Sequence, residues 1–216
     1  FMGSNDGMSF WEVLHELEND APLKDLKRSI FKHRMLKILR KGTVEERNAI
    51  LKNICKEQIY LNQELMKAWH VAMQVHGNNE AYRIFFQYCI ESQEPVLSEL
   101  ANTLSALGGG TPEEVLRSYR PNPRAQLLSS TYSWMFVSQP PACSVLILNV
   151  ILRTWGVVCM HIMEALRSDL EALELTEEDL GFFSMHDLVG SGDQKMDYTW
   201  MVKGLKKVYK EGLENG

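Results

Sequence analysis

Two glutamates and a histidine lie in aromatic surroundings and could carry acid–base chemistry. Glu91 and Glu94 follow a run of aromatic and apolar residues, and a spacing of three makes them neighbours on a helix. Carboxylates in such surroundings are paired, metal-bound or protonated, unless they form an exposed acidic face. His186 ends the segment Phe182-Phe-Ser-Met-His186. It could act as an acid, a base or a ligand, or have a purely structural role.

A polar stripe runs along the most apolar segment of the chain, a helix expected over 143–173. At about 100° per residue, Asn149, Arg153 and Gly156 fall on one side of that helix, with Glu164 near its end. An unpaired buried arginine is costly. Arg153 therefore pairs with an internal carboxylate, pairs with an anionic ligand, or lies at the surface.

A second polar face is expected on the long helical segment 44–76. Glu57 and Glu64 are seven residues apart, and Tyr60 lies on roughly the same face. These side chains are either solvated surface groups or part of a binding site.

We take His186, Glu91 and Arg153 as candidate catalytic residues. The candidate substrate-binding residues are Asn149, Glu94, Tyr60 and Glu64.

Helical periodicity runs through nearly the whole chain and predicts an all-α fold. Capping patterns at Ser9, Thr43 and Thr111 mark helix starts, and no strand-like alternation of useful length is present. We expect one domain over 8–216, with about eight helices around a central helix that is buried on all sides. Residues 1–7 look like a cloning remnant. The main expected helices cover about 23–41, 44–76, 80–107, 124–137, 143–173 and 196–213, with a disturbance at Pro95.

Composition narrows the classes of function. The 216 residues carry 23 Lys and Arg against 28 Asp and Glu, a net charge of −5, which argues against a nucleic-acid partner. The four cysteines form no C-x-x-C pair and suit reduced, buried thiols, so we expect a cytoplasmic protein. Arg153 within the apolar segment argues against a membrane span. Glycine-rich nucleotide-binding motifs, H-E-x-x-H and G-x-S-x-G are absent from the sequence.

The order of features resembles a known superfamily over about 33–206. The segment His33-Arg-Met-Leu-Lys-Ile-Leu-Arg-Lys-Gly42 is followed by the long helix, the acidic aromatic segment at Glu91, the apolar helix and the Phe-x-x-x-His at His186. This order resembles the haem-oxygenase-like helical superfamily. That superfamily contains thiaminase II (TenA), the pyrroloquinoline-quinone synthesis protein C and a group of non-haem iron oxidases.

The resemblance implies a small-molecule enzyme or binder with a central cavity and a role in biosynthesis. We expect no cofactor, and we expect the chemistry of a metal-independent oxidase or hydrolase. A homodimer is one assembly that the superfamily allows. The first alternative is an oxidoreductase that binds iron through Glu91, His186 and Asp193 or Asp197. The family's iron oxidases carry a histidine seven residues after the glutamate, where this chain has Ser98. The second alternative is an inactive relative that binds a partner.

Overall fold

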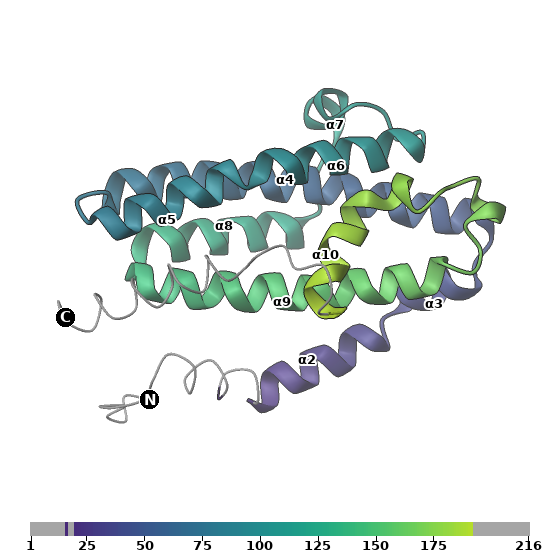
Figure 1. Ribbon diagram of the computed structural model, residues 1–216, viewed down its shortest axis with the longest axis horizontal. Helices are drawn as coiled ribbons and strands as arrows, with labels where there is room; N and C mark the ends of the chain where they lie inside the picture. The colour runs from purple at the N-terminus through teal and green to yellow at the C-terminus, as the bar shows by residue number, and fades with distance from the viewer. Residues whose placement is uncertain (1–15, 17–19, 192–216) are drawn as a thin grey trace.

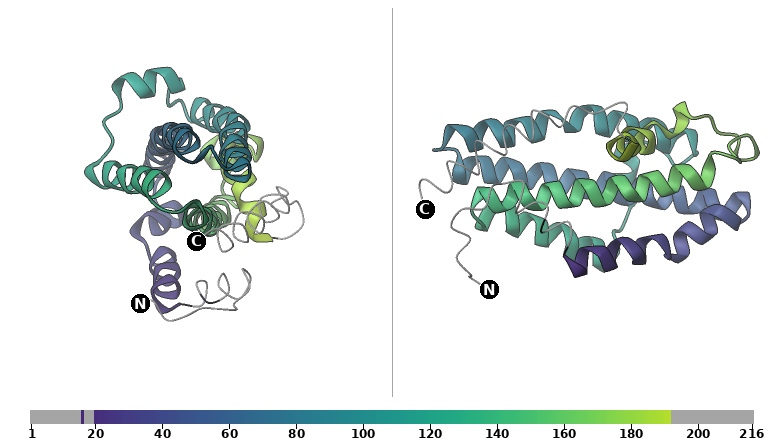
Figure 2. Two further views of the ribbon diagram at one scale, coloured as in Figure 1. Left: turned by 90° about the vertical axis from the view of Figure 1, so that its left-hand side faces the viewer. Right: turned by 60° about the horizontal axis from the view of Figure 1, so that its bottom comes forward.

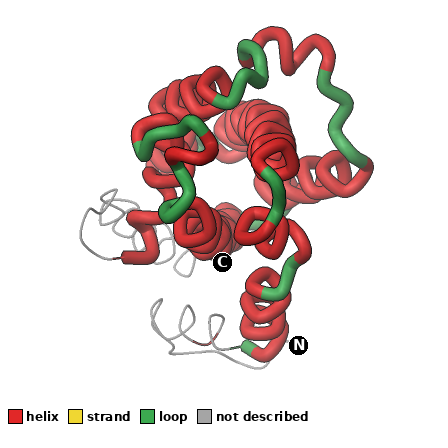
Figure 3. Tube along the Cα trace, turned by 90° about the vertical axis from the view of Figure 1, so that its right-hand side faces the viewer, coloured by secondary structure: helices red, strands yellow, loops and turns green. Residues whose placement is uncertain are grey.

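The structure is a computed structural model that describes Glu16 and residues 20–191 (Figure 1). The helices expected at Ser9 and over 196–213 lie outside these residues. Within the described part, the chain is helical and contains no strand, which confirms the all-α prediction (Figure 3). In chain order, the elements are α2 (Ala21–Phe31), α3 (Arg34–Lys41), α4 (Val44–His76), α5 (Glu80–Glu91), α6 (Gln93–Ala106), α7 (Pro112–Ser118), α8 (Pro123–Ser138), α9 (Pro141–Leu166), the 3-10 turns η1 (Glu171–Leu173) and η2 (Glu178–Leu180), and α10 (Gly181–Ser191).

Capping residues define the start of α4 as the sequence predicts. The Thr43 hydroxyl accepts a hydrogen bond from the backbone N–H of Glu46 at 3.3 Å, and the Glu46 carboxylate accepts one from the Thr43 N–H at 2.9 Å. This reciprocal arrangement satisfies two of the N–H groups that a helix start leaves unpaired. The helix then continues without interruption to His76, which confirms the predicted range.

The single helix expected over 80–107 is instead two helices. α5 ends at Glu91 and α6 begins at Gln93, with Ser92 between them. The cause is Pro95, which has no N–H to bond the Glu91 carbonyl, so the α-helix cannot continue through this turn. In the first turn of α6, where backbone N–H groups have no partner within the helix, the same proline is tolerated.

The helices form an elongated bundle with two cores. α4, α5, α6, α8 and α9 run along its long axis, and α10 crosses α9 (Figures 1 and 2). One core joins α3, the first half of α4, α6, the end of α9 and α10, and includes the fully buried Phe182 and Phe183. The other joins the second half of α4, α5, α8 and the start of α9, around Phe86 and Phe136. α4 is long enough to contribute to both.

The apolar helix α9 is less enclosed than the sequence suggests. Cys159, Ile162 and Leu166 are fully buried, but most described side chains over 146–158 are only half-buried. The prediction that this helix is buried on all sides is therefore wrong for the side chains over 146–158. The C-terminal end of α9 packs into the core that also contains α3 and α10, whereas the preceding part of the helix is less covered. Among the described helices, α9 alone has a stretch long and apolar enough to cross a membrane (146–166).

Arg47 connects the junction between α3 and α4 to a segment far along the chain. Its side chain is largely buried, and Nη1 lies 2.6 Å from Oδ2 of Asp169. Its Nε donates to the Gly42 carbonyl at 3.0 Å and its Nη2 to the Arg40 carbonyl at 3.2 Å. Arg47 thus joins the end of α3, the start of α4 and the loop that leaves α9.

Replacing Arg47 tests this connection. Arg47→Met removes all three hydrogen bonds, and we expect a loss of about 2–3 kcal/mol of unfolding free energy in urea denaturation. Arg47→Lys keeps the charge but not the planar fork, so it should fall between the wild type and the Met variant. Asp169→Asn leaves the two carbonyl contacts intact and should cost less than Arg47→Met. Equal losses in Asp169→Asn and Arg47→Met would show that the carbonyl contacts contribute nothing.

Candidate active site

His186 lies on α10 where this helix crosses α9, and its ring is 6% exposed. Its Nδ1 is 2.8 Å from the carbonyl oxygen of Phe182, one turn earlier on α10. A carbonyl oxygen only accepts, so Nδ1 carries the proton and donates. Nε2 is then a lone-pair acceptor, and no residue that the structure describes makes a hydrogen bond to it.

Two aromatic rings lie beside His186, and its burial changes its pKa. The ring centroid of Phe182 is 4.8 Å away and that of Trp155, on α9, is 6.3 Å away. Burial lowers the pKa of His186 below its ordinary value of 6.5, and the hydrogen bond to Phe182 offsets part of this shift. The imidazole is therefore neutral at pH 7, so in its resting state His186 can act as a base through Nε2.

Trp155 adds a hydrogen-bond donor to the same place. Its indole Nε1 is buried and has no hydrogen-bond partner in the part of the chain that is described. A buried indole N–H usually finds an acceptor, because leaving it unpaired costs free energy. Trp69 has an equally unpaired Nε1 in the other core, where the nearby ring belongs to Phe136. Among the described tryptophans, Trp155 alone combines an unpaired Nε1 with a ring contact to the buried His186.

The other predicted site residues with described side chains belong to α4, α5 and α6 rather than to α9 or α10. Glu91 is exposed at the end of α5 and accepts a hydrogen bond from Gln87 at 2.6 Å; Glu94 is exposed on α6. On α4, the Tyr60 hydroxyl lies 3.2 Å from the Ser129 hydroxyl, and Glu64 pairs with Lys67 at 2.6 Å. No hydrogen bond or ion pair between described residues joins any of these four to His186.

Four predicted residues have side chains outside the described part. Asn149 and Arg153 belong to α9, whose backbone is described at these positions, whereas Asp193 and Asp197 lie entirely outside the described residues. The described residues contain no group of three or more His, Cys, Asp or Glu side chains arranged to hold a metal ion.

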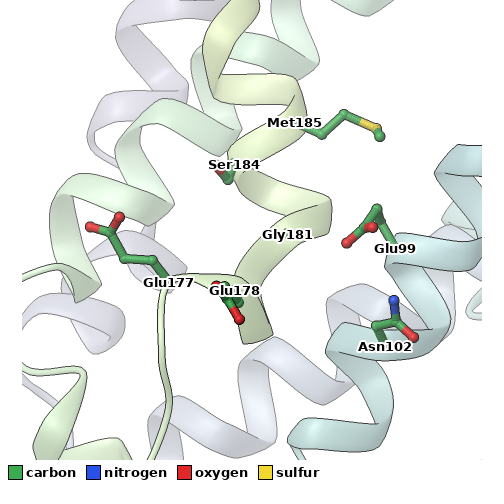
Figure 4. Close-up of a pocket in the computed structure, with 7 residues that line it drawn as sticks. All are labelled: Glu99, Asn102, Glu177, Glu178, Gly181, Ser184 and Met185. Atoms are coloured by element: carbon green, nitrogen blue, oxygen red, sulfur yellow. The ribbon is translucent and has the colours of Figure 1, made fainter.

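An open pocket of about 540 Å³ lies on a different face of α10 (Figure 4). It is lined by Glu99, Asn102, Glu177, Glu178, Gly181, Ser184 and Met185, from α6, η2 and α10 together with the residue before η2. The spacing of Gly181, Ser184 and Met185 puts these three on one side of α10, turned away from Phe182 and His186. Sequence reasoning missed this pocket, because its glutamates come from two distant segments.

Glu99 and Gly181 fit tightly together at the pocket's edge. A Cβ atom on Gly181 would lie 2.1 Å from Oε2 of Glu99, so only glycine leaves room for the carboxylate there. The carboxylate lies at the N-terminal end of α10, where the helix dipole favours negative charge. Among the described residues, Glu177 alone of the three pocket glutamates has a basic partner, Arg167 at 3.5 Å.

Comparison with known proteins identifies no relative: no family model matches the chain, and neither a curated protein nor a solved structure matches it. The argument for function therefore rests on the chemistry of the described residues. Of these, His186 is the buried histidine with a defined tautomer, a lowered pKa and an unpaired donor beside it.

The lowered pKa of His186 predicts a pH-dependent stability. Between pH 6.5 and the lower pKa in the folded state, the unfolded chain binds more protons, so stability is lost as pH falls through that window. We expect His186 to contribute up to about 1.4 kcal/mol per pH unit there.

His186→Asn keeps a donor near Nδ1 without a titrating ring. Urea denaturation from pH 7.5 to 5 should show a shallower loss in this variant, with His70→Asn, on an exposed face of α4, as the matched control. Parallel pH curves for the wild type and His186→Asn would contradict a neutral buried His186.

The contact between Glu99 and Gly181 predicts a measurable coupling. Gly181→Ala forces the Glu99 carboxylate away from the start of α10. A double-mutant cycle with Glu99→Ala should therefore give an interaction energy of about 0.5–1 kcal/mol. The same cycle with Glu178→Ala, which removes a pocket carboxylate outside van der Waals reach of that Cβ, should give none. Equal values in the two cycles would show that Glu99 does not occupy this position.

Proposed function

We propose that this protein binds and transforms a small molecule at the crossing of α9 and α10, with His186 as the general base. The observation that carries the proposal is the hydrogen bond from Nδ1 to the Phe182 carbonyl in a buried ring. It fixes the tautomer and the orientation of the imidazole, leaving Nε2 as the basic atom. A general base must be unprotonated at the working pH, and burial favours that state.

The proposed step is a proton transfer within the aromatic cluster. Nε2 accepts a proton from an O–H or C–H group of the substrate, and the electron pair of that bond stays on the substrate as a developing oxyanion. The Trp155 N–H, unpaired among the described residues, is the donor proposed to stabilise that oxygen. Because burial disfavours the imidazolium, the proton returns to the product rather than remaining on His186.

The haem-oxygenase-like fold and a metal-independent oxidase or hydrolase activity belong to the same proposal. The all-helical bundle is compatible with that fold, and the resemblance in the order of sequence features supports it. Arg153 and Asn149, both on α9, are the proposed holders of an anionic substrate group. Glu91, Tyr60 and Glu64 receive no role here, because their described contacts are with other residues, and Glu94 receives none because it is exposed on α6.

A binding screen with paired variants tests the proposal. Small keto acids and phenols are suitable probes, because each offers a removable proton and an oxygen that can accept from an indole N–H. Ligand-observed NMR should detect at least one binder, and His186→Asn and Trp155→Phe should each weaken it about tenfold or more, the cost of one lost hydrogen bond in a buried site. Trp69→Phe removes the other buried indole N–H that lacks a partner among the described residues, and it should leave binding unchanged.

Two results would overturn this assignment. Binding that survives both His186→Asn and Trp155→Phe would place the site elsewhere. Ferrous iron taken up anaerobically at one or more equivalents per chain, and lost in His186→Asn, would favour the iron-oxidase alternative instead.

A further inference from the structure

Basic residues are concentrated in one stretch of an otherwise acidic chain. Eight of the 23 Lys and Arg lie within 24–41, but only one of the 28 Asp and Glu does. This stretch therefore carries a net charge of +7, while the remainder of the chain carries −12. It forms α3 and most of α2, which follow one another along one edge of the molecule, called here the α2–α3 edge (Figures 1 and 2).

The basic side chains of α3 are exposed and unpaired. Arg34, Lys37 and Lys41 are separated by three and four residues, so they share one side of the helix. Leu36 and Leu39, on the other side, are fully buried in the larger core. No described residue makes an ion pair with any of the three basic side chains. Their charges are therefore available to an anionic partner.

α2 adds basic groups and an aromatic ring on one side of its own. Lys24, Arg28 and Phe31 are separated by four and three residues, and all three are exposed. The one acidic neighbour, Asp25, lies 3.4 Å from Arg28, and both side chains are in solvent, where such a pair contributes little. Phe31 is 51% exposed. A large apolar side chain among lysines and arginines is typical of helices that lie on a membrane surface.

The surroundings of Phe31 favour lipid over nucleic acid as the partner. The guanidinium of Arg40 lies over the ring at 5.1 Å from its centroid, and the ring of His161, on α9, is 5.0 Å away. Stacking on a nucleic-acid base needs a free ring face, and these two neighbours already occupy part of the space around the ring. Insertion among lipid headgroups needs only an exposed apolar surface, which Phe31 supplies.

Lysine predominates among the exposed basic groups of this edge. The described ones are Lys24, Arg28, Lys32, Arg34, Lys37 and Lys41. A lysine ammonium acts as a compact point charge, whereas the planar fork of arginine matches a single carboxylate through two hydrogen bonds. The predominance of lysine therefore suits the diffuse charge of an anionic membrane surface better than the discrete carboxylates of an acidic protein.

We propose that the α2–α3 edge docks on an anionic membrane surface, with Phe31 inserted at the level of the headgroups. Each Lys or Arg held close to such a surface strengthens binding, and the effect falls off within a Debye length. The same surface repels the acidic remainder of the chain, so the protein approaches with this edge first. The docking needs no membrane-spanning segment and does not depend on the role proposed for His186.

Vesicle co-sedimentation with the full chain tests the contribution of charge. Phosphatidylcholine vesicles with about one-third phosphatidylserine should bind the protein at low salt, pure phosphatidylcholine should not, and added salt should weaken binding. Arg34→Glu combined with Lys37→Glu should weaken binding about thirtyfold or more. As the matched control, Arg83→Glu combined with Arg117→Glu makes the same change in net charge at exposed positions on α5 and α7. This control should bind nearly as the wild type does.

A second pair of variants tests the contribution of Phe31. Phe31→Ser removes the ring without changing the charge and should weaken binding to the anionic vesicles about tenfold. Leu26 is 46% exposed and lies about 140° around α2 from Phe31, at about 100° per residue. Leu26→Ser makes a similar change on a different side of the helix and should leave binding nearly unchanged.

Four results would overturn the proposal. The wild type could fail to bind anionic vesicles, or the two charge-reversal pairs could weaken binding equally, which would leave no role for this edge. Phe31→Ser could bind as the wild type does, and any anionic partner would then suffice. Finally, duplex DNA or polyglutamate that binds more tightly than the vesicles and displaces the protein from them would identify a nucleic acid or an acidic protein as the partner.

Discussion

The three hydrogen bonds of Arg47 are the constraint on which the candidate site depends. One of them holds Asp169 near the end of α3 and the start of α4, and the other two hold Arg47 itself against Gly42 and Arg40. This position of Asp169 determines where the chain turns back after α9. The returning segment forms η1 and η2 and enters α10, whose first residues pack against α6: the Phe182 N–H donates to the Thr103 hydroxyl at 3.4 Å. Because α10 is anchored in this way, Phe182 and Phe183 are fully buried, and His186 is held against α9. The pKa of Asp169 is lowered mainly by its hydrogen bond from Arg47, so this connection persists at neutral pH.

A buried neutral histidine is an exception to the rule that protein cores exclude polar groups. Its Nδ1 proton is satisfied within one helical turn by the Phe182 carbonyl, which lowers the cost of burying the ring. An asparagine or glutamine would present both a donor and an acceptor on one freely rotating amide. The rigid imidazole instead holds the donor and the acceptor at two fixed positions of one ring. That separation, rather than the mere presence of a histidine, makes the position suitable for proton transfer.

The sequence predicted local features well and tertiary ones poorly. The start and end of α4 depend on Thr43, Glu46 and Gly77, which act within a turn of the helix and can be read directly. The division between α5 and α6 follows equally local chemistry at Pro95, although its effect begins one turn earlier than expected. Arg47 went unnoticed, because a lone arginine on an amphipathic helix looks the same whether it is solvated or clamped by Asp169, 122 positions later in the chain. Glu91 has the same ambiguity: its aromatic neighbours pack inward while the carboxylate remains in solvent.

The separation of the bundle into two cores also places the candidate site in one part of the molecule. His186 packs with Phe182 and Trp155 at the end of the molecule that contains the larger core. The inner side of α8 belongs to the smaller core, where Phe136 meets Trp69 edge to face. Among the described helices, α4 and α9 contribute side chains to both cores, so a change in the smaller core reaches His186 mainly through these two helices.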